Sequence, residues 1–168
     1  MVYKYAAIGL LLATIMSPMA GAEEEGALTT YRMLSPNTAL ELAQAAMASC
    51  RENGYQVAVT VVDRMGVVQV VLRDRFAGPH TPDTAWRKAR TAVSFRTDTL
   101  SLSSLTASGE PQSGARFIPD TLMIGGGVPV ESQGFIIGAI GVSGSPGGPQ
   151  DDACARAAIK AIQDKLEF

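Results

Sequence analysis

Residues 56–73 decide the fold, and they read Gln56-Val-Ala-Val-Thr-Val-Val-Asp63, Arg64-Met-Gly66 and Val67-Val-Gln-Val-Val-Leu-Arg73. The first and last of these runs are rich in β-branched residues, which are typical of strands. A short turn that contains Asp63 and Gly66 separates them. Two such runs joined by a short turn predict a β-hairpin.

A second set of strands is predicted further along the chain. Leu122–Ile124 and Val128–Glu131 flank three consecutive glycines, and after a polar turn the run Phe135–Val142 is apolar throughout except for two glycines. A short apolar run bounded by turn residues is typical of a buried strand. We therefore expect a second antiparallel group of strands beside the first hairpin.

Helices are predicted before, between and after these strands. Ser35 followed by Pro36 is typical of an N-cap and a first helical position, and an apolar stripe at helical spacing then continues as far as Cys50. Thr81 followed by Pro82 predicts the N-cap of a second helix. A third helix follows the glycine-rich run 144–148.

The order of these elements is α-β-β-α-β-β-α, which describes an α+β fold, an antiparallel sheet with helices packed on it. Residues 98–118 are polar and serine-rich and contain Gly109, Pro111 and Gly114. We expect short helical turns and an exposed excursion there rather than core.

The N-terminal residues 1–22 have the pattern of a secretory signal peptide. Lys4 supplies the positive charge, residues 5–16 are mostly apolar, and Ala20-Gly21-Ala22 is a typical cleavage site. The apolar stretch is shorter than the roughly 20 residues that span a membrane. We therefore expect a periplasmic or secreted protein with no membrane span after cleavage, although an uncleaved anchor is the alternative. Residues 23–34 are predicted to be a flexible leader and residues 35–168 a single domain.

Composition excludes several classes of function. The chain carries 14 Lys and Arg against 16 Asp and Glu, a net charge of −2, which does not favour a nucleic-acid partner. With His80 as its single histidine and no C-x-x-C motif, the chain cannot form a multi-histidine or four-cysteine metal site. A catalytic triad would also need His80 as its base. The residues therefore indicate a binding protein more than an enzyme.

His80 and three basic residues are the candidate ligand contacts. His80 lies in a loop and is either an ordinary polar surface residue or an axial ligand of haem iron, a common role of imidazole. Arg87 and Lys88 belong either to a solvated helix face or, together with Arg73, to a set that pairs with ligand carboxylates such as haem propionates. These residues alone do not select haem.

Cys50 and Cys154 are a candidate disulfide. Cys50 is near the end of the first predicted helix and Cys154 near the start of the last, each on the apolar stripe. If the two helices pack antiparallel on one face of the sheet, these ends meet, and export supplies an oxidising compartment. Two buried free thiols are the alternative.

Four motifs, in this order and spread over residues 35–166, resemble the GlcG/HbpS family, which is related to the C-terminal domain of PduO-type proteins. They are Val59-Thr-Val-Val-Asp63 with Gly66 and Arg73, Ala85-Trp-Arg-Lys-Ala-Arg-Thr-Ala92, Ile124-Gly-Gly-Gly-Val-Pro-Val130, and Gly138-Ala-Ile-Gly-Val-Ser-Gly144 before Asp151.

The resemblance implies a five-stranded antiparallel sheet, a symmetric homo-oligomer and non-covalent haem binding, with roles in haem sensing, storage or degradation. Its pocket would be built around His80, the iron ligand, with Arg87, Lys88 and the glycines Gly125 and Gly126. The Asp-Gly-Ala usual in the family after the strand-ending arginine is altered here, next to the expected pocket. The alternative function is therefore non-haem small-molecule binding, or an assembly subunit without catalytic activity.

Overall fold

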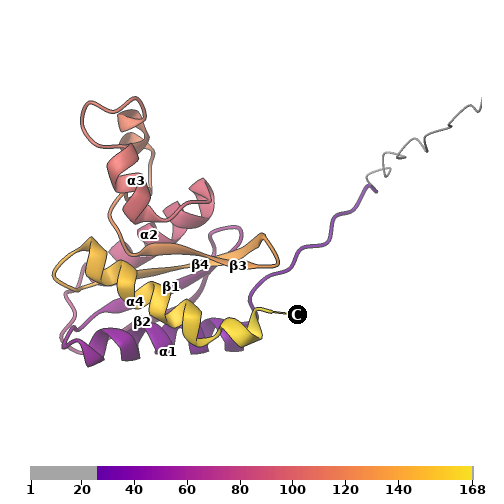
Figure 1. Ribbon diagram of the computed structural model, residues 1–168, viewed down its shortest axis with the longest axis horizontal. Helices are drawn as coiled ribbons and strands as arrows, with labels where there is room; N and C mark the ends of the chain where they lie inside the picture. Colours follow the sequence, from indigo (N-terminus) through magenta and orange to yellow (C-terminus); the bar gives the residue numbers. More distant parts are fainter. Residues whose placement is uncertain (1–25, 168) are drawn as a thin grey trace, which may run out of the picture. The chain divides into compact units, whose positions relative to one another are not determined.

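The computed structural model describes residues 26–167. The chain divides into two units, Met1–Thr30 and Tyr31–Phe168, and every element described lies in the second. The expected signal peptide and residues 23–25 of the expected leader lie outside the described residues. The elements in chain order are α1 (Pro36–Glu52), β1 (Ala58–Asp63), β2 (Val68–Arg73), α2 (Thr81–Phe95), α3 (Thr99–Leu105), the 3₁₀-helix η1 (Ser113–Phe117), β3 (Gly127–Ser132), β4 (Phe135–Ser143), α4 (Gly148–Ala161) and the 3₁₀-helix η2 (Gln163–Lys165) (Figure 1).

The sheet has the strand order β2-β1-β4-β3, and every neighbouring pair is antiparallel. The first predicted hairpin is confirmed as β1 and β2, and the α+β class is confirmed with it. The register between β1 and β2 shifts once, because Val61 pairs with Val70 and Val62 with Val68. Gln69 is therefore the additional residue of a β-bulge in β2. The two central strands, β1 and β4, therefore have neighbours on both sides, and β2 and β3 form the edges.

The expected five-stranded sheet is wrong, because the sheet in the described residues has four strands. The run Leu122–Ile124, expected to be a strand, pairs with none of them. Its first backbone N–H donates to the hydroxyl of Thr91 on α2 (2.8 Å). At its end, a Cβ on Gly125 would lie 2.8 Å from the carbonyl oxygen of Gly148 on α4. The segment is held by helices and not by a neighbouring strand.

Helices cover both faces of the sheet. The larger core cluster joins α1 and α4 to one face, through residues such as Leu42, Val59, Ile140 and Ala158. A smaller cluster joins α2 to the other face, through Val62, Ala89, Ala92, Val93 and Ala139. The β-branched strand residues are thus divided between two apolar layers, as alternation along a strand requires.

Glycines in β3 and β4 let α2 approach the sheet closely. A Cβ on Gly141 would lie 1.9 Å from the carbonyl oxygen of Ala85, and one on Gly127 would lie 2.2 Å from that of Lys88. At these two positions the strand glycines serve a helix–sheet contact within the subunit.

The start of α2 differs by one residue from the expected start. The helix begins at Thr81, and His80 occupies the cap position without a side-chain cap bond. The Thr81 hydroxyl donates to the carbonyl oxygen of Gly78 (2.7 Å). The Ser35 cap of α1 is confirmed, because its hydroxyl accepts from the N–H of Thr38 (3.2 Å).

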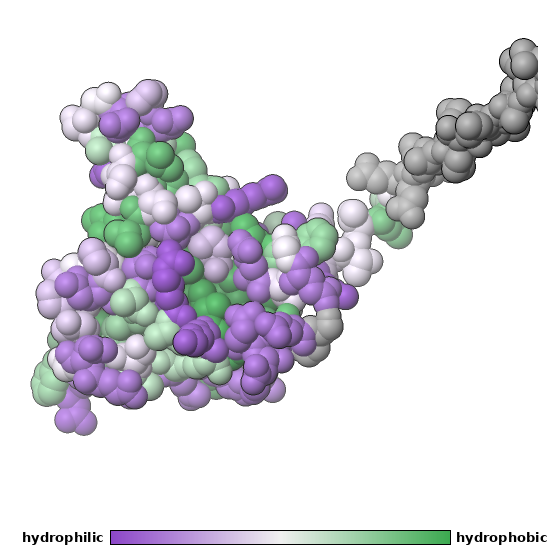
Figure 2. All heavy atoms as spheres, viewed as in Figure 1, coloured by the Kyte–Doolittle hydropathy of each residue, from purple (hydrophilic) through white to green (hydrophobic). Residues whose placement is uncertain are grey.

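Residues 98–118 form α3 and η1, an arm that stands away from the sheet in Figure 1. The expected short helical turns and exposed excursion are therefore confirmed. Apolar side chains reach the surface of this arm (Figure 2), among them Phe117 and Ile118.

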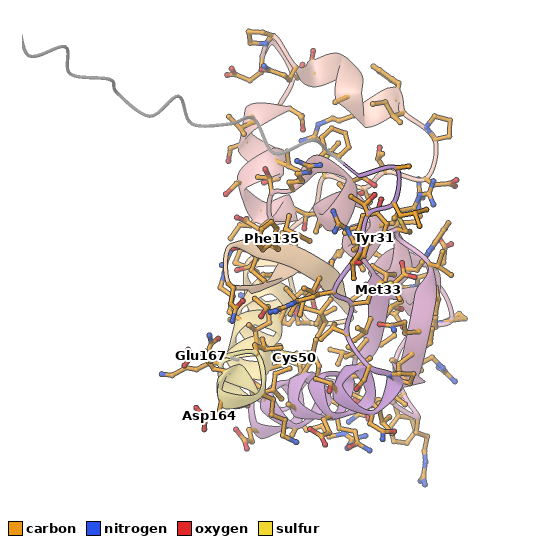
Figure 3. The ribbon with its side chains drawn as sticks, turned by 90° about the vertical axis from the view of Figure 1, so that its right-hand side faces the viewer. Tyr31, Met33, Cys50, Phe135, Asp164 and Glu167 are labelled. Atoms are coloured by element: carbon orange, nitrogen blue, oxygen red, sulfur yellow. A yellow bond between two sulfur atoms is a disulfide. The ribbon has the colours of Figure 1, made fainter. Side chains whose placement is uncertain are left out.

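A disulfide joins Cys50 to Cys154, whose Cα atoms are 5.4 Å apart although 104 residues separate them in sequence. In Figure 3, Cys50 is labelled between α1 and α4. The two helices share one face of the sheet, so the end of α1 meets the start of α4.

Among the described residues, no helix is both long enough and apolar enough to cross a membrane.

Candidate ligand-binding cleft

A cleft of about 580 Å³ opens where three loops of the domain meet. We call it the His80 cleft. Its volume is within the range of small-molecule sites. Four parts of the chain line it. They are the residues that follow α1 (Gly54, Tyr55, Gln56), the loop before α2 with the first turns of α2 (Phe76, Gly78, His80, Thr81, Thr84, Lys88), Ile124, and the β4–α4 loop with the start of α4 (Ser143–Gly148, Asp151).

His80 presents its imidazole at this cleft. The residue is exposed, and its carbonyl oxygen accepts from the hydroxyl of Thr84 one turn into α2 (3.0 Å). The ring lies over Gly78, where an added Cβ would be 2.7 Å from Cε1 and 3.0 Å from Nδ1. Among the described residues, no hydrogen bond engages either ring nitrogen. The imidazole therefore remains available to a ligand.

Lys88 is a cleft residue of a different kind, because its side chain is only 2% exposed. Its ammonium donates to the carboxylate of Asp151 (2.7 Å) and to the carbonyl oxygen of Val142 (3.0 Å). An ammonium has three N–H donors. One of them has no acceptor within the described part of the chain. Lys88 is not part of a solvated face, since it joins α2 to the end of β4 and the start of α4.

Asp151 is the functional residue that sequence reasoning missed. A carboxylate in the first turn of a helix interacts favourably with the helix dipole, and the sequence indicates nothing further for Asp151. The structure shows that one carboxylate oxygen accepts from Lys88 and the other from the backbone N–H of Ser145 (3.1 Å). Asp151 therefore fixes the glycine-rich β4–α4 loop that lines the cleft. No spacing signal in the sequence indicates this partnership, because 63 residues separate the two side chains.

The two other basic candidates do not line the His80 cleft. Arg73 is exposed at the end of β2, and its guanidinium donates to the carbonyl oxygen of Ala77. Arg87 donates to the carbonyl oxygen of Thr121 (3.2 Å), and its Nε is buried without a partner among the described residues. Both guanidinium groups thus hold loops of the domain itself.

The candidate glycines Gly125 and Gly126 lie behind the cleft rather than in its lining. Gly126 has a φ of +115°, and a Cβ there would lie 2.6 Å from the Cβ of Asp151 and 3.1 Å from the Nζ of Lys88. The glycine therefore leaves the space that the buried ion pair occupies. A side chain at this position would displace that pair.

A second cleft, of about 690 Å³, lies beside β3 and α4 and contains an ion-pair network. Arg156 contacts Asp152 (2.6 Å) and Asp98 (3.4 Å). Burial raises the pKa of Asp98, but hydrogen bonds from Ser101 and the charge of Arg156 outweigh it and lower the pKa below its ordinary value. The side-chain hydrogen bond to Asp152 raises the pKa of Arg156. Asp98 also caps α3 by accepting from the N–H of Ser101 (2.8 Å).

The side chains that could hold a metal decide whether the haem that the sequence resemblance implies fits this domain. No group of three or more His, Cys, Asp and Glu side chains in the described residues is arranged to hold a metal ion. Haem iron needs only an axial ligand from the protein, and imidazole is a common one. The free imidazole of His80 and the 77% exposed ring of Phe76 in the same cleft fit such a group.

The fold is a small α+β domain, an antiparallel sheet between helices, with a candidate ligand-binding cleft beside its single histidine. A family model described as "Haem degrading protein HbpS-like" matches residues 34–160. The chain belongs to the HbpS-like family. No curated protein matches it significantly.

Solved structures agree with this assignment. A double mutant of HbpS from Streptomyces reticuli is 35% identical over 94% of this chain and 99% of its own, with a TM-score of 0.77. The ORFY protein of Klebsiella pneumoniae is 27% identical over 82% of this chain and 95% of its own (TM-score 0.78). A PduOC–haem complex is 31% identical over 77% of this chain and 95% of its own (TM-score 0.73).

Proposed function

We propose that this protein binds haem in the His80 cleft, with the imidazole of His80 as axial ligand to the iron. The observation that carries the proposal is the exposed imidazole, with both ring nitrogens free among the described residues, at a cleft of about 580 Å³. The family match and the relative solved as a haem complex support the same ligand.

Each part of the cleft has a distinct role in this proposal. His80 binds the iron, and Phe76 offers apolar surface to the macrocycle. The donors for the haem carboxylates would be the remaining N–H of Lys88 and the N–H groups of Gly148 and Gln150 at the start of α4, which have no partner among the described residues. Bound haem would supply redox-active iron, and the role proposed from the family resemblance is haem sensing, storage or degradation.

We also propose that the protein is exported, to the periplasm or outside the cell, and that it forms a symmetric homo-oligomer. The signal-like N-terminal sequence and the disulfide support export, because disulfides persist in oxidising compartments. The resemblance of the sequence motifs to the GlcG/HbpS family supports the homo-oligomer.

The test is a haem titration of the purified protein and of His80→Ala, followed by the Soret absorption band. We expect a shifted Soret band for the unmodified protein, and a loss of that shift with weaker binding for His80→Ala. Glu110→Ala is the matched control, because Glu110 is an exposed residue of the arm away from the cleft. An unchanged spectrum and affinity in His80→Ala would refute the role of His80.

The competing proposal is a non-haem small molecule as ligand. It is favoured by the Lys88–Asp151 pair, which leaves the cleft without an uncompensated buried cation for a propionate. Absence of any Soret shift in the unmodified protein would support this alternative and contradict haem binding.

A further inference from the structure

Asp74 is a buried carboxylate at the start of the loop that carries His80. It is the first residue after β2 and is only 4% exposed. Its Oδ1 accepts from Nε (2.8 Å) and Nη2 of Arg51, in the last turn of α1. Its Oδ2 accepts from the backbone N–H of Val57, directly before β1 (3.2 Å). Both carboxylate oxygens are therefore in use, and hydrogen bonds between ionised groups are among the stronger ones.

These contacts join two parts of the lining of the His80 cleft. The partners Arg51 and Val57 flank in sequence the lining residues 54–56. The loop that begins at Asp74 supplies three further lining residues, Phe76, Gly78 and His80. One side chain thus sets how the residues after α1 lie relative to the loop that carries the histidine.

Backbone hydrogen bonds extend this anchor along the loop. The N–H of Asp74 donates to the carbonyl oxygen of Val57 (2.9 Å), and the N–H of Ala77 donates to that of Asp74 (3.2 Å). The far end of the loop is fixed by the start of α2. The imidazole of His80 makes no hydrogen bond of its own among the described residues, so its place at the cleft depends on these loop contacts.

We infer that Asp74 is a positioning residue for haem, because its contacts with Arg51 and Val57 hold the loop in which His80 reaches the iron. The inference rests on the haem binding proposed above. A ligand group that is already in place costs less free energy on binding than one that binding must order. Loss of the Asp74 contacts should therefore weaken haem binding and disturb coordination by His80, although Asp74 itself does not line the cleft.

The test compares Asp74→Asn with Asp152→Asn. The two carboxylates are matched, since Asp74 is 4% exposed beside a 54% exposed arginine and Asp152 is 6% exposed beside a 52% exposed arginine. Asp152 does not line the His80 cleft. Each variant is titrated with haem, and its unfolding in urea is measured without haem. We expect both variants to lose stability, but only Asp74→Asn to bind haem about tenfold or more weakly, with a Soret band that differs from that of the unmodified complex.

Hydrogen exchange of the haem-free protein examines the loop directly. The amide of Ala77 should exchange faster in Asp74→Asn than in Asp152→Asn, because the loop opens more often. If Asp74→Asn does not fold, Arg51→Lys compared with Arg156→Lys decides by the same measurements. Lysine keeps the charge but not the geometry of the guanidinium. Arg51→Lys should then weaken haem binding and speed the exchange of Ala77, and Arg156→Lys should do neither.

The outcomes separate the role of Asp74 from haem binding itself. An unmodified protein without a shifted Soret band, or a His80→Ala protein that binds haem unchanged, would overturn the proposed function and this inference with it. Where both of those results agree with the proposed function, an Asp74→Asn protein with the haem affinity and spectrum of Asp152→Asn would overturn the positioning role alone. Equal exchange of the Ala77 amide in the two variants would overturn it as well.

Discussion

Lys88 and Asp151 form an ion pair of 2.7 Å between Nζ and Oδ2, with side chains only 2% and 5% exposed. The pair joins α2 to the first turn of α4 in the lining of the His80 cleft. Asp151 also accepts from the N–H of Ser145, so the ion pair is linked directly to the β4–α4 loop. The cleft is thus built on a buried charge pair.

Replacing Lys88 with Met should lower the free energy of unfolding by about 3–5 kcal/mol, because it leaves the Asp151 carboxylate buried without its cation. Urea denaturation followed by circular dichroism measures this loss. The double variant Lys88→Met with Asp151→Leu removes both charges and should lose less than the two single changes combined. Strictly additive losses would show that the two charges do not depend on each other.

The fold was largely predictable from local patterns, and the site was not. Each sequence signal for a hairpin, a helix cap or a helix is contained in a short stretch of neighbouring residues. The strands of the first hairpin and the Ser35 cap could therefore be predicted correctly. The apolar run Leu122–Ile124 looked like a strand, and only tertiary contacts with Thr91 and Gly148 prevent that. Lys88 looked like a surface cation because its partner Asp151 is distant in sequence. Such pairings are set by packing and leave no periodic signal.

Removing the disulfide by Cys50→Ala with Cys154→Ala should destabilise the protein by about 4–5 kcal/mol in the loop-entropy model, because the bridge closes a loop of 104 residues. Thermal unfolding of this variant, and of the unmodified protein with and without reductant, measures the effect. Equal melting temperatures under all conditions would contradict a stabilising bridge.

Gly141→Ala should lower the free energy of unfolding by about 1–3 kcal/mol or more, because the new methyl group would overlap the carbonyl oxygen of Ala85 and push α2 from the sheet. Gly114→Ala is the control, since a Cβ there meets nothing within 4 Å. The denaturant midpoints of the two variants measure the difference in their stability. A Gly141→Ala protein as stable as Gly114→Ala would show that α2 does not pack as described.

Asp98 should contribute stability that depends on pH. Its pKa is lowered in the folded protein, so its contribution is complete above the pKa of the unfolded chain, about 3.9, and is lost as the pH falls through the folded value. Asp98→Asn keeps a capping acceptor for Ser101 but not the charge. The unmodified protein should exceed this variant in stability by less than about 1 kcal/mol near neutral pH, because Arg156 is 52% exposed.

Denaturation of both proteins at about pH 7 and about pH 2 measures this advantage. It should shrink at the acidic pH, as the carboxylate of Asp98 takes up a proton and loses the charge that Asn lacks. An advantage of the same size at both pH values would contradict the ionic contribution of Asp98.

The most direct test of the central claim is chemical rescue of the His80 cleft. His80→Gly removes the imidazole and opens space at a position that is already exposed. Haem is titrated into this variant with and without free imidazole, and the Soret and visible bands are recorded. We predict that the variant alone loses the spectrum of the unmodified haem complex and that added imidazole restores it. A His80→Gly protein that binds haem with the unmodified spectrum without imidazole would contradict the account.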